Sequence, residues 1–147
     1  MVTFEHKAFD ALTLRELHDV LWLRNEVFVV GQKITAEAEV DGSDPDCVHV
    51  IGRDDGGRVI ATARLFVAKD PIKVGRVAVA RDLQGSGAGT SLMMYVRDTV
   101  IGPRPSALSA QQYLEPWYTR MGWATVGEAY VEAEIPHVWM ERAGQRG

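Results

Sequence analysis

The stretch VAVARDLQGSGAG, residues 77–89, decides how we expect this chain to fold. It begins with the small and β-branched residues of a buried strand and continues into three glycines at alternate positions, Gly85, Gly87 and Gly89. A helical pattern of apolar residues follows, from Leu92 to Val100. Glycines let a ligand approach the backbone, and the first N–H groups of a helix have no partner within it. This predicts a phosphate or pyrophosphate site, with a flexible turn that only starts a helix as the alternative.

Three classes of phosphate-binding loop compete for this stretch. A Walker loop needs a lysine after its last glycine, but Thr90 follows Gly89. A dinucleotide-binding loop needs a third glycine where Thr90 stands, and it opens its domain, whereas this loop lies past the middle of the chain. The third class is the pyrophosphate loop of an acyl-CoA-dependent transferase. This class needs neither a lysine nor a glycine at the position of Thr90, so it fits the stretch.

The composition bounds the class of protein. The chain has 147 residues, 46% of them apolar, so we expect one domain over 1–147, with a frayed tail at about 143–147. The net charge is −4 with no basic block, so no nucleic-acid partner is expected. No apolar run approaches the ~18 residues of a membrane span, and no signal peptide opens the chain, so no membrane partner is expected. A single cysteine, Cys47, fits a reducing cytoplasm.

Strand and helix patterns alternate outward from the glycine loop. A capping box of Thr13 and Glu16 starts a helix, which β-branched residues and Gly31 end. The apolar face of this helix is expected to contain Leu14, Leu17, Leu21 and Phe28. The sequence DGG at 55–57 predicts a hairpin turn. We expect the order β α β β β α β α β β, an α/β (α+β) fold with a mixed, mostly antiparallel central sheet flanked by helices. The strands are expected at 2–9, 48–53, 59–68, 73–80, 106–110, 123–131 and 135–142, the last two around a turn near residue 134.

Motifs along nearly the whole chain resemble the GNAT superfamily of N-acetyltransferases. The sequence QGSGAG at 84–89 matches the superfamily's signature R/Q-x-x-G-x-G/A. AQQYLEPWYTRMGW at 110–123 is similar to its terminal (F/L)-Y-x-x-x-G-F element. RNEVFVV at 24–30, GRV at 75–77 and IPH at 135–137 resemble the ElaA-like branch. The chain departs from these patterns at Gly31, where that branch has an acid, and at Gln111, where the superfamily often has asparagine.

The resemblance implies acetyl-CoA as co-substrate and gives roles to both motifs. It implies that amides around residues 85–89 hold the pyrophosphate and that the strand at 77–79 pairs with the pantetheine arm. It implies that the phenol of Tyr118 protonates or stabilises the leaving thiolate, whereas a packed structural tyrosine is the alternative. The cofactor-binding residues expected in this way are Val77, Ala78, Val79, Gln84, Gly85, Ser86, Gly87, Ala88, Gly89, Thr90 and Gln111.

The attacking amine must lose a proton, because an alkylammonium with a pKa of ~10 has no free electron pair. The candidate bases are His137, which lies in a branch-matching motif, and His49, Glu132, Glu134 and Asp41. Each also has a structural interpretation, as a strand histidine with satisfied hydrogen bonds or as a solvated loop acid.

An acidic run lies in the loop expected at 31–46. Its members are Glu37, Glu39, Asp41, Asp44 and Asp46, with no basic residue between the first and the last. An acidic rim would attract a cationic amine, and an ordinary soluble loop is the alternative. Arg64 and Arg76, on expected strands, could hold an acidic group of the acceptor or pair with a carboxylate.

These residues predict an N-acetyltransferase that moves acetyl from acetyl-CoA to an amine by direct attack in a ternary complex. Tyr118 is the expected acid and His137 the leading base. A non-catalytic CoA-binding sensor or partner-binding module is the alternative, and a nucleotide-binding regulator is a second one. The expected acceptor is a small molecule or a peptide, the expected oligomer a monomer or homodimer, and no metal is expected because no His, Cys and Asp grouping has metal-site spacing.

Overall fold

The computed structural model of the protein describes residues 1–145. Its strands form one eight-stranded sheet. They are β1 (Thr3–Ala8), β2 (Val48–Arg53), β3 (Val59–Phe66), β4 (Ile72–Val79), β5 (Ser106–Gln111), β6 (Ala124–Thr125), β7 (Tyr130–Glu132) and β8 (Ile135–Arg142). The helices are α1 (Leu14–Arg24), α2 (Ala88–Tyr95) and α3 (Glu115–Arg120); α1 and α2 continue as π-helical turns at Asn25–Gly31 and Val96–Ile101.

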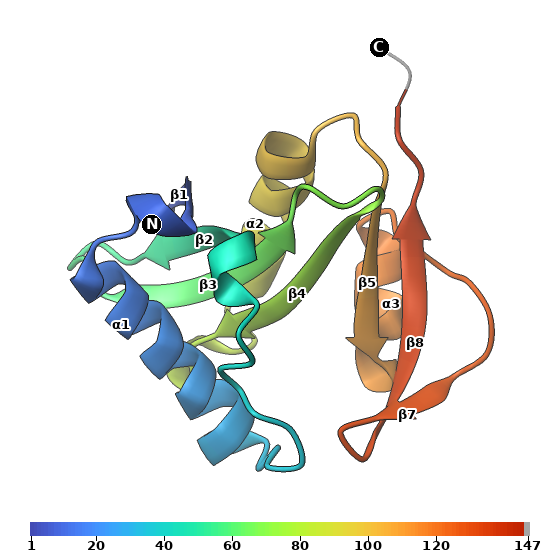
Figure 1. Cartoon of the computed structure of the whole chain (residues 1–147), viewed down its shortest axis with the longest axis horizontal. Helices are drawn as coiled ribbons and strands as arrows, with labels where there is room; N and C mark the ends of the chain where they lie inside the picture. The colour runs from blue at the N-terminus through green and yellow to red at the C-terminus, as the bar shows by residue number, and fades with distance from the viewer. Residues whose placement is uncertain (146–147) are drawn as a thin grey trace.

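The sheet has the order β1-β2-β3-β4-β5-β8-β6, and β7 pairs with β8 beside it (Figure 1). Every pair of neighbouring strands is antiparallel except β4 and β5, which are parallel. Parallel neighbours need a crossover, and α2 supplies it. The expected fold, a mostly antiparallel sheet flanked by helices, is therefore confirmed.

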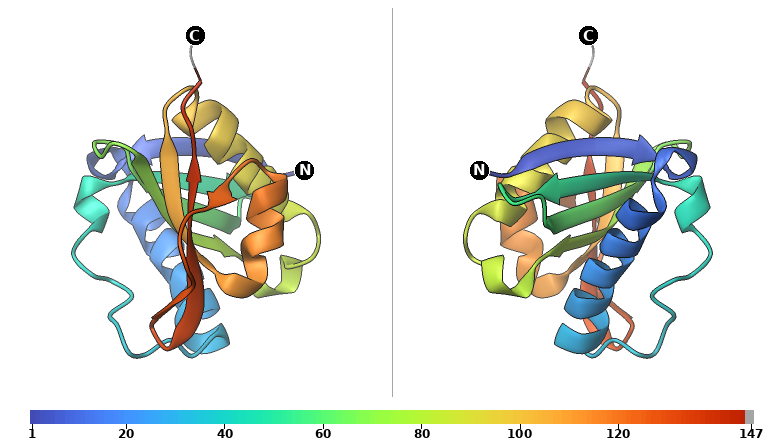
Figure 2. Two further views of the ribbon diagram at one scale, coloured as in Figure 1. Left: turned by 90° about the vertical axis from the view of Figure 1, so that its right-hand side faces the viewer. Right: turned by 90° about the vertical axis from the view of Figure 1, so that its left-hand side faces the viewer.

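Helices cover both faces of the sheet. Figure 2 shows α1 on one side and α2 and α3 on the other. The larger core lies under α2 and α3, where Leu92, Met93 and Val96 are fully buried against the strands. Burial of each such side chain contributes about 1.5–3 kcal/mol to the free energy of unfolding, so the α2 side holds the crossover firmly against β3 and β4.

The start of α1 follows its capping box. Thr13 Oγ1 accepts the Glu16 backbone N–H at 3.0 Å, and Glu16 Oε1 accepts the Thr13 backbone N–H at 2.9 Å. These two bonds satisfy N–H groups that a helix leaves without partners at its first turn. The capping box expected from the sequence is therefore confirmed, and the π-helical turn that continues the helix ends at Gly31, as expected.

The apolar face expected for α1 is only partly correct, because Leu17, Leu21 and Phe28 are half-buried and not fully buried. Leu14 is 89% exposed, whereas Val20 and Leu23 are buried against the sheet. Two charged residues, Glu16 and Arg24, lie on the same buried face. A face chosen from apolar residues alone leaves out buried charged residues. The expected face was therefore placed along neighbouring leucines and not along the side that is buried.

The single strand expected at 123–131 is also wrong. Two short strands, β6 and β7, replace it, and Gly127 between them has a left-handed φ of +84°. The turn expected near residue 134 is present, with positive φ at Ala133 and Glu134. After β8, residues 143–145 belong to no strand or helix, but the Gln145 N–H donates to the Pro103 carbonyl at 2.8 Å. The rest of the expected tail, 146–147, lies outside the described residues.

Candidate active site

A cleft of about 940 Å³ opens where β4 and β5 separate. Their pairing stops at Val74 and Leu108. Beyond Val74, β4 pairs only with β3, so the backbone edge of residues 75–79 that faces β5 has no strand partner. Arg76, with φ of +50°, lies at the register shift between β3 and β4. The expectation that β4 is buried on both faces is therefore wrong: its burial alternates because one face borders the cleft.

The glycine loop forms part of the cleft wall. Gly85 and Gly87 have φ of +83° and +92°, where side chains other than glycine are strained, and a Cβ at either position would meet no atom within 4 Å. Gly87 directly precedes α2. A Cβ at Gly89 would lie 3.4 Å from the Trp117 ring, which is an ordinary van der Waals contact, so the packing of α3 does not require glycine at this position. The loop thus exposes backbone at a helix N-terminus, as a pyrophosphate site requires.

Most residues expected to bind acetyl-CoA line this cleft. They are Val77, Ala78, Val79, Gln84, Gly85, Gly87, Gly89, Thr90 and Gln111. Ser86 and Ala88 do not line it: the Ser86 hydroxyl donates to the Leu83 carbonyl, and Ala88 is buried in the core. Their side chains therefore serve the loop and the core.

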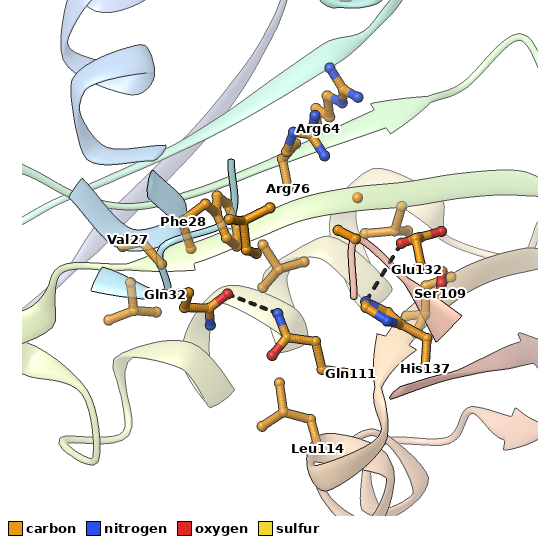
Figure 3. A pocket seen from close by; sticks show the side chains of 18 of the residues that line it. Val27, Phe28, Gln32, Arg64, Arg76, Ser109, Gln111, Leu114, Glu132 and His137 are labelled. Atoms are coloured by element: carbon orange, nitrogen blue, oxygen red, sulfur yellow. Dashed lines mark hydrogen bonds and ion pairs between the residues drawn. The ribbon is translucent and has the colours of Figure 1, made fainter. Parts of the chain in front are cut away.

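Two polar side chains of this set have partners across the cleft wall. Thr90 Oγ1 accepts the Trp117 indole N–H at 3.1 Å, which joins α2 to α3. Gln111 Nε2 donates to Gln32 Oε1 at 2.9 Å, and this bond links β5 to the end of the α1 segment (Figure 3). Sequence reasoning missed Gln32, because nothing local marks a loop glutamine as the partner of a residue 79 positions away.

Tyr118 reaches the cleft from α3. Its side chain is 5% exposed and packs edge-on against Trp117 and Trp123, at ring-centroid distances of 4.8 Å and 6.3 Å. Burial raises the pKa of its phenol above the ordinary value of 10.0, so the phenol is protonated at neutral pH. Among the described residues no group hydrogen-bonds this hydroxyl, so it is free to donate to a ligand.

His137 lies on the opposite wall, on β8. Its Nδ1 is 2.7 Å from the Ile135 carbonyl oxygen, which can only accept, so Nδ1 carries the hydrogen. The neutral ring then has its free electron pair on Nε2. That atom lies 3.5 Å from a Glu132 carboxylate oxygen (Figure 3). The ring also stacks on Tyr130, whose hydroxyl hydrogen-bonds Ser109. These contacts fix the orientation of an imidazole that can accept a proton at Nε2.

The other candidate bases are placed differently. His49 is fully buried, its Nε2 donates to the Asp44 carbonyl at 2.9 Å, and burial lowers its pKa, so it is a neutral core residue outside the cleft. Glu134 is exposed and does not line the cleft. Asp41 lines it but is bound by Arg64. Of these remaining candidates, only Glu132 lines the cleft without an arginine partner, and its carboxylate lies beside His137.

Three arginines neutralise three acids of the loop at 31–46. The six residues are Arg24, Arg64, Arg76, Glu39, Asp41 and Asp44. Arg24 contacts Asp44 at 2.7 Å and Arg64 contacts Asp41 at 2.7 Å, and both arginines are nearly inaccessible. Burial disfavours the Asp44 carboxylate, but hydrogen bonds and charge from both arginines outweigh it and lower its pKa. Such buried pairs fix the loop against the sheet.

The expected acidic rim is therefore wrong for most of its members. Glu39, Asp41 and Asp44 form ion pairs within the protein. Of the five acids, only Glu37 and Asp46 are exposed without such a partner among the described residues. Arg64 and Arg76 pair with these carboxylates, which was the plainer of the two interpretations considered for them.

The comparison with known families agrees with this geometry. A family model described as "Acetyltransferase (GNAT) domain" matches residues 30–143. The chain belongs to this family. The splayed strands, the glycine loop before α2 and the family match together identify an acyltransferase domain.

Relatives of this GNAT chain lie in the branch that its motifs resemble. It is 37% identical to a UPF0039 protein of Schizosaccharomyces pombe, over 93% of this chain and 94% of that one. It is 32% identical to Protein ElaA of Escherichia coli, over 97% of each chain. Among solved structures, an acyl-CoA N-acyltransferase from Pseudomonas aeruginosa is 36% identical with a TM-score of 0.86, over 97% of this chain and 100% of that one.

Two further features are absent from residues 1–145 of the GNAT domain. These residues hold no cluster of three or more His, Cys, Asp or Glu side chains placed to bind a metal ion. In the same range, no helix is long and apolar enough to cross a membrane.

Proposed function

We propose that the protein is an N-acetyltransferase that transfers the acetyl group of acetyl-CoA to an amine by direct attack in a ternary complex. The observation that carries this proposal is that the glycine loop, Tyr118 and His137 all line the same cleft. One group can donate a proton and the other can accept one, as the two halves of acyl transfer require.

The donor half rests on backbone groups. Amides of residues 85–89, at the positive end of the α2 dipole, bind the pyrophosphate of the coenzyme. The unpaired edge of β4 at 75–79 pairs with the amides of the pantetheine arm, as an added strand would. A backbone N–H of residues 77–79 then polarises the thioester carbonyl, because it is held in place before the substrate arrives.

The transfer step follows from the two walls of the cleft. His137 Nε2 accepts a proton from the bound ammonium, and the neutral amine nitrogen then attacks the thioester carbonyl and forms the C–N bond. The nitrogen releases its second proton to solvent, from which the Tyr118 phenol is restored after the transfer. The C–S bond then breaks, and the Tyr118 phenol donates to the leaving sulfur. Glu132 stabilises the imidazolium formed at His137. Both substrates are held in the cleft at once, so no acyl-enzyme is needed.

Two measurements test this function. Calorimetry with coenzyme A should show binding, and acetyl-CoA with a panel of primary amines should release free thiol in amounts equal to the acetylated amine. A CoA-binding sensor would bind the coenzyme and release no thiol with any amine in the panel. A nucleotide-binding regulator predicts that ATP or NAD competes with coenzyme A, so we expect no such competition.

A His137→Gln variant tests the base. We expect kcat to fall by about 10- to 100-fold at pH 7, because the variant has no ring nitrogen to accept the amine proton. The deficit should shrink as the pH rises toward the amine pKa of ~10, because the acceptor then arrives neutral. A deficit that stays constant across this pH range would identify His137 as a structural residue. His49→Gln, outside the cleft, controls for general loss of a strand histidine.

A further inference from the structure

Some of the cationic side chains that line the cleft form ion pairs with carboxylates of the protein, and others do not. Arg64 and Arg76 are bound by loop carboxylates, as described above. Lys69 and Lys73 also line the cleft, and neither forms an ion pair within residues 1–145. A half-buried ammonium such as that of Lys73 loses part of its hydration and gains from an anionic partner. These two lysines are therefore the open cations of the cleft.

The two lysines flank one aromatic ring. The Lys69 Nζ lies 4.3 Å from the centroid of the Phe66 ring. Lys73 is the direct register partner of Phe66 across β3 and β4, so their side chains leave the same face of the sheet. Phe66 is half-buried and lines the cleft. The Lys69 ammonium therefore lies over the face of this ring, where the Arg64 guanidinium carbon also lies 5.4 Å from the ring centroid. The Phe66 ring thus gathers cationic groups in this region of the cleft.

This region lies away from the proposed base. Lys73 is level with Ala107 on β5, whereas His137 is level with Gln111, four residues further along the same strand. Four residues of extended strand span roughly 13 Å. Glu132 adds a negative charge beside His137. The cleft therefore presents negative charge where an amine is deprotonated, and open positive charge about 13 Å along the sheet.

The pyrophosphate of the coenzyme does not account for these lysines. It is assigned to residues 85–89, which follow the far end of β4, whereas Lys73 lies at the beginning of that strand. The open lysines thus belong to the acceptor side of the cleft.

Resting on the proposed function, we propose that the acceptor is a primary amine that carries a carboxylate several methylene groups away. Its ammonium end binds near Glu132 and His137, its carboxylate binds Lys69 and Lys73, and the methylene chain spans the cleft between these two ends. The long lysine side chains shorten the gap that the chain must span. An α-amino acid, whose amine and carboxylate are adjacent, does not reach both ends.

Two pairs of acceptors test this proposal by thiol release from acetyl-CoA. In the long pair, 6-aminohexanoate is compared with hexylamine; in the short pair, 3-aminopropanoate is compared with propylamine. We expect the carboxylate to raise kcat/KM about tenfold or more in the long pair, mainly through KM, and to have little effect in the short pair. Equal kcat/KM for 6-aminohexanoate and hexylamine would overturn the proposal, while turnover of both would leave the proposed function standing.

Variants assign the effect to the lysines. In a Lys69→Gln/Lys73→Gln double variant, the preference for 6-aminohexanoate over hexylamine should fall to about one. Arg120→Gln removes a positive charge from an exposed position outside the cleft and should leave that preference as it is. A preference that persists in the double variant would overturn the proposal. If coenzyme A binds but neither member of the long pair releases thiol, transfer to small amines fails as well.

Discussion

A Gly87→Val variant is expected to lose binding of coenzyme A, with affinity weakened by at least about 100-fold. Gly87 has φ of +92°, a conformation in which a β-branched residue is strongly disfavoured. It lies directly before α2 in the cleft wall, where a pyrophosphate must approach the backbone. Valine therefore either distorts the loop, which moves the amides, or keeps the loop and covers them. Calorimetry with coenzyme A measures the loss.

Gly57→Val provides a matched control for strain. Gly57 has φ of +87°, and a Cβ there would also meet no atom within 4 Å, but the residue lies in the β2–β3 hairpin and not in the cleft. Both variants should lower the melting temperature by similar amounts, whereas only Gly87→Val should lose coenzyme binding. Normal binding by Gly87→Val would contradict the assignment of the pyrophosphate to this loop.

The features that the sequence predicted are those encoded by neighbouring residues. The capping box at Thr13 spans four positions, the hairpin glycines stand next to each other, and the glycine loop is one continuous stretch. Turn and cap preferences act over these short separations. The order of elements follows from such signals, and the cleft follows in turn, because the crossover through α2 makes β4 and β5 parallel neighbours.

The features that the sequence did not predict depend on distant partners. Arg24 is buried because Asp44 neutralises it from a loop 20 residues away, and Arg64 reaches the same carboxylate from a strand. Neither side of such a pair indicates its partner, so the sequence did not show that three of the five loop acids are neutralised by arginines. The same limit misplaced the buried face of α1, which contains that arginine.

The candidate site contains both kinds of feature, those encoded by neighbouring residues and those that depend on distant partners. His137 belonged to a recognisable motif, but the hydrogen on its Nδ1 follows only from the Ile135 carbonyl beside it. Glu132 was one of several acids that the sequence could not rank. Its position opposite Nε2 arises from the β7–β8 turn, where Ala133 has positive φ without being glycine. Local sequence thus proposed the groups, and chain topology selected among them.

A Tyr118→Phe variant should lower kcat by at least about 100-fold and leave the affinity for coenzyme A nearly unchanged. As the C–S bond breaks, negative charge develops on sulfur in a site where the neighbouring rings of Trp117 and Trp123 exclude water. A phenol whose pKa is raised by burial stays protonated there and can donate to that charge. Loss of a general acid typically costs about 10²- to 10⁴-fold in rate.

The substitution is nearly neutral for the fold, which makes the kinetic effect interpretable. Phenylalanine keeps the ring that packs against both tryptophans, and no described protein group loses a hydrogen bond when the hydroxyl is removed. Tyr95→Phe is the control, because it removes a phenol that binds His6 away from the cleft. Equal losses of kcat and coenzyme affinity in Tyr118→Phe would identify a structural tyrosine. A loss in kcat alone requires that the hydroxyl acts after both substrates are bound, when the thiolate departs.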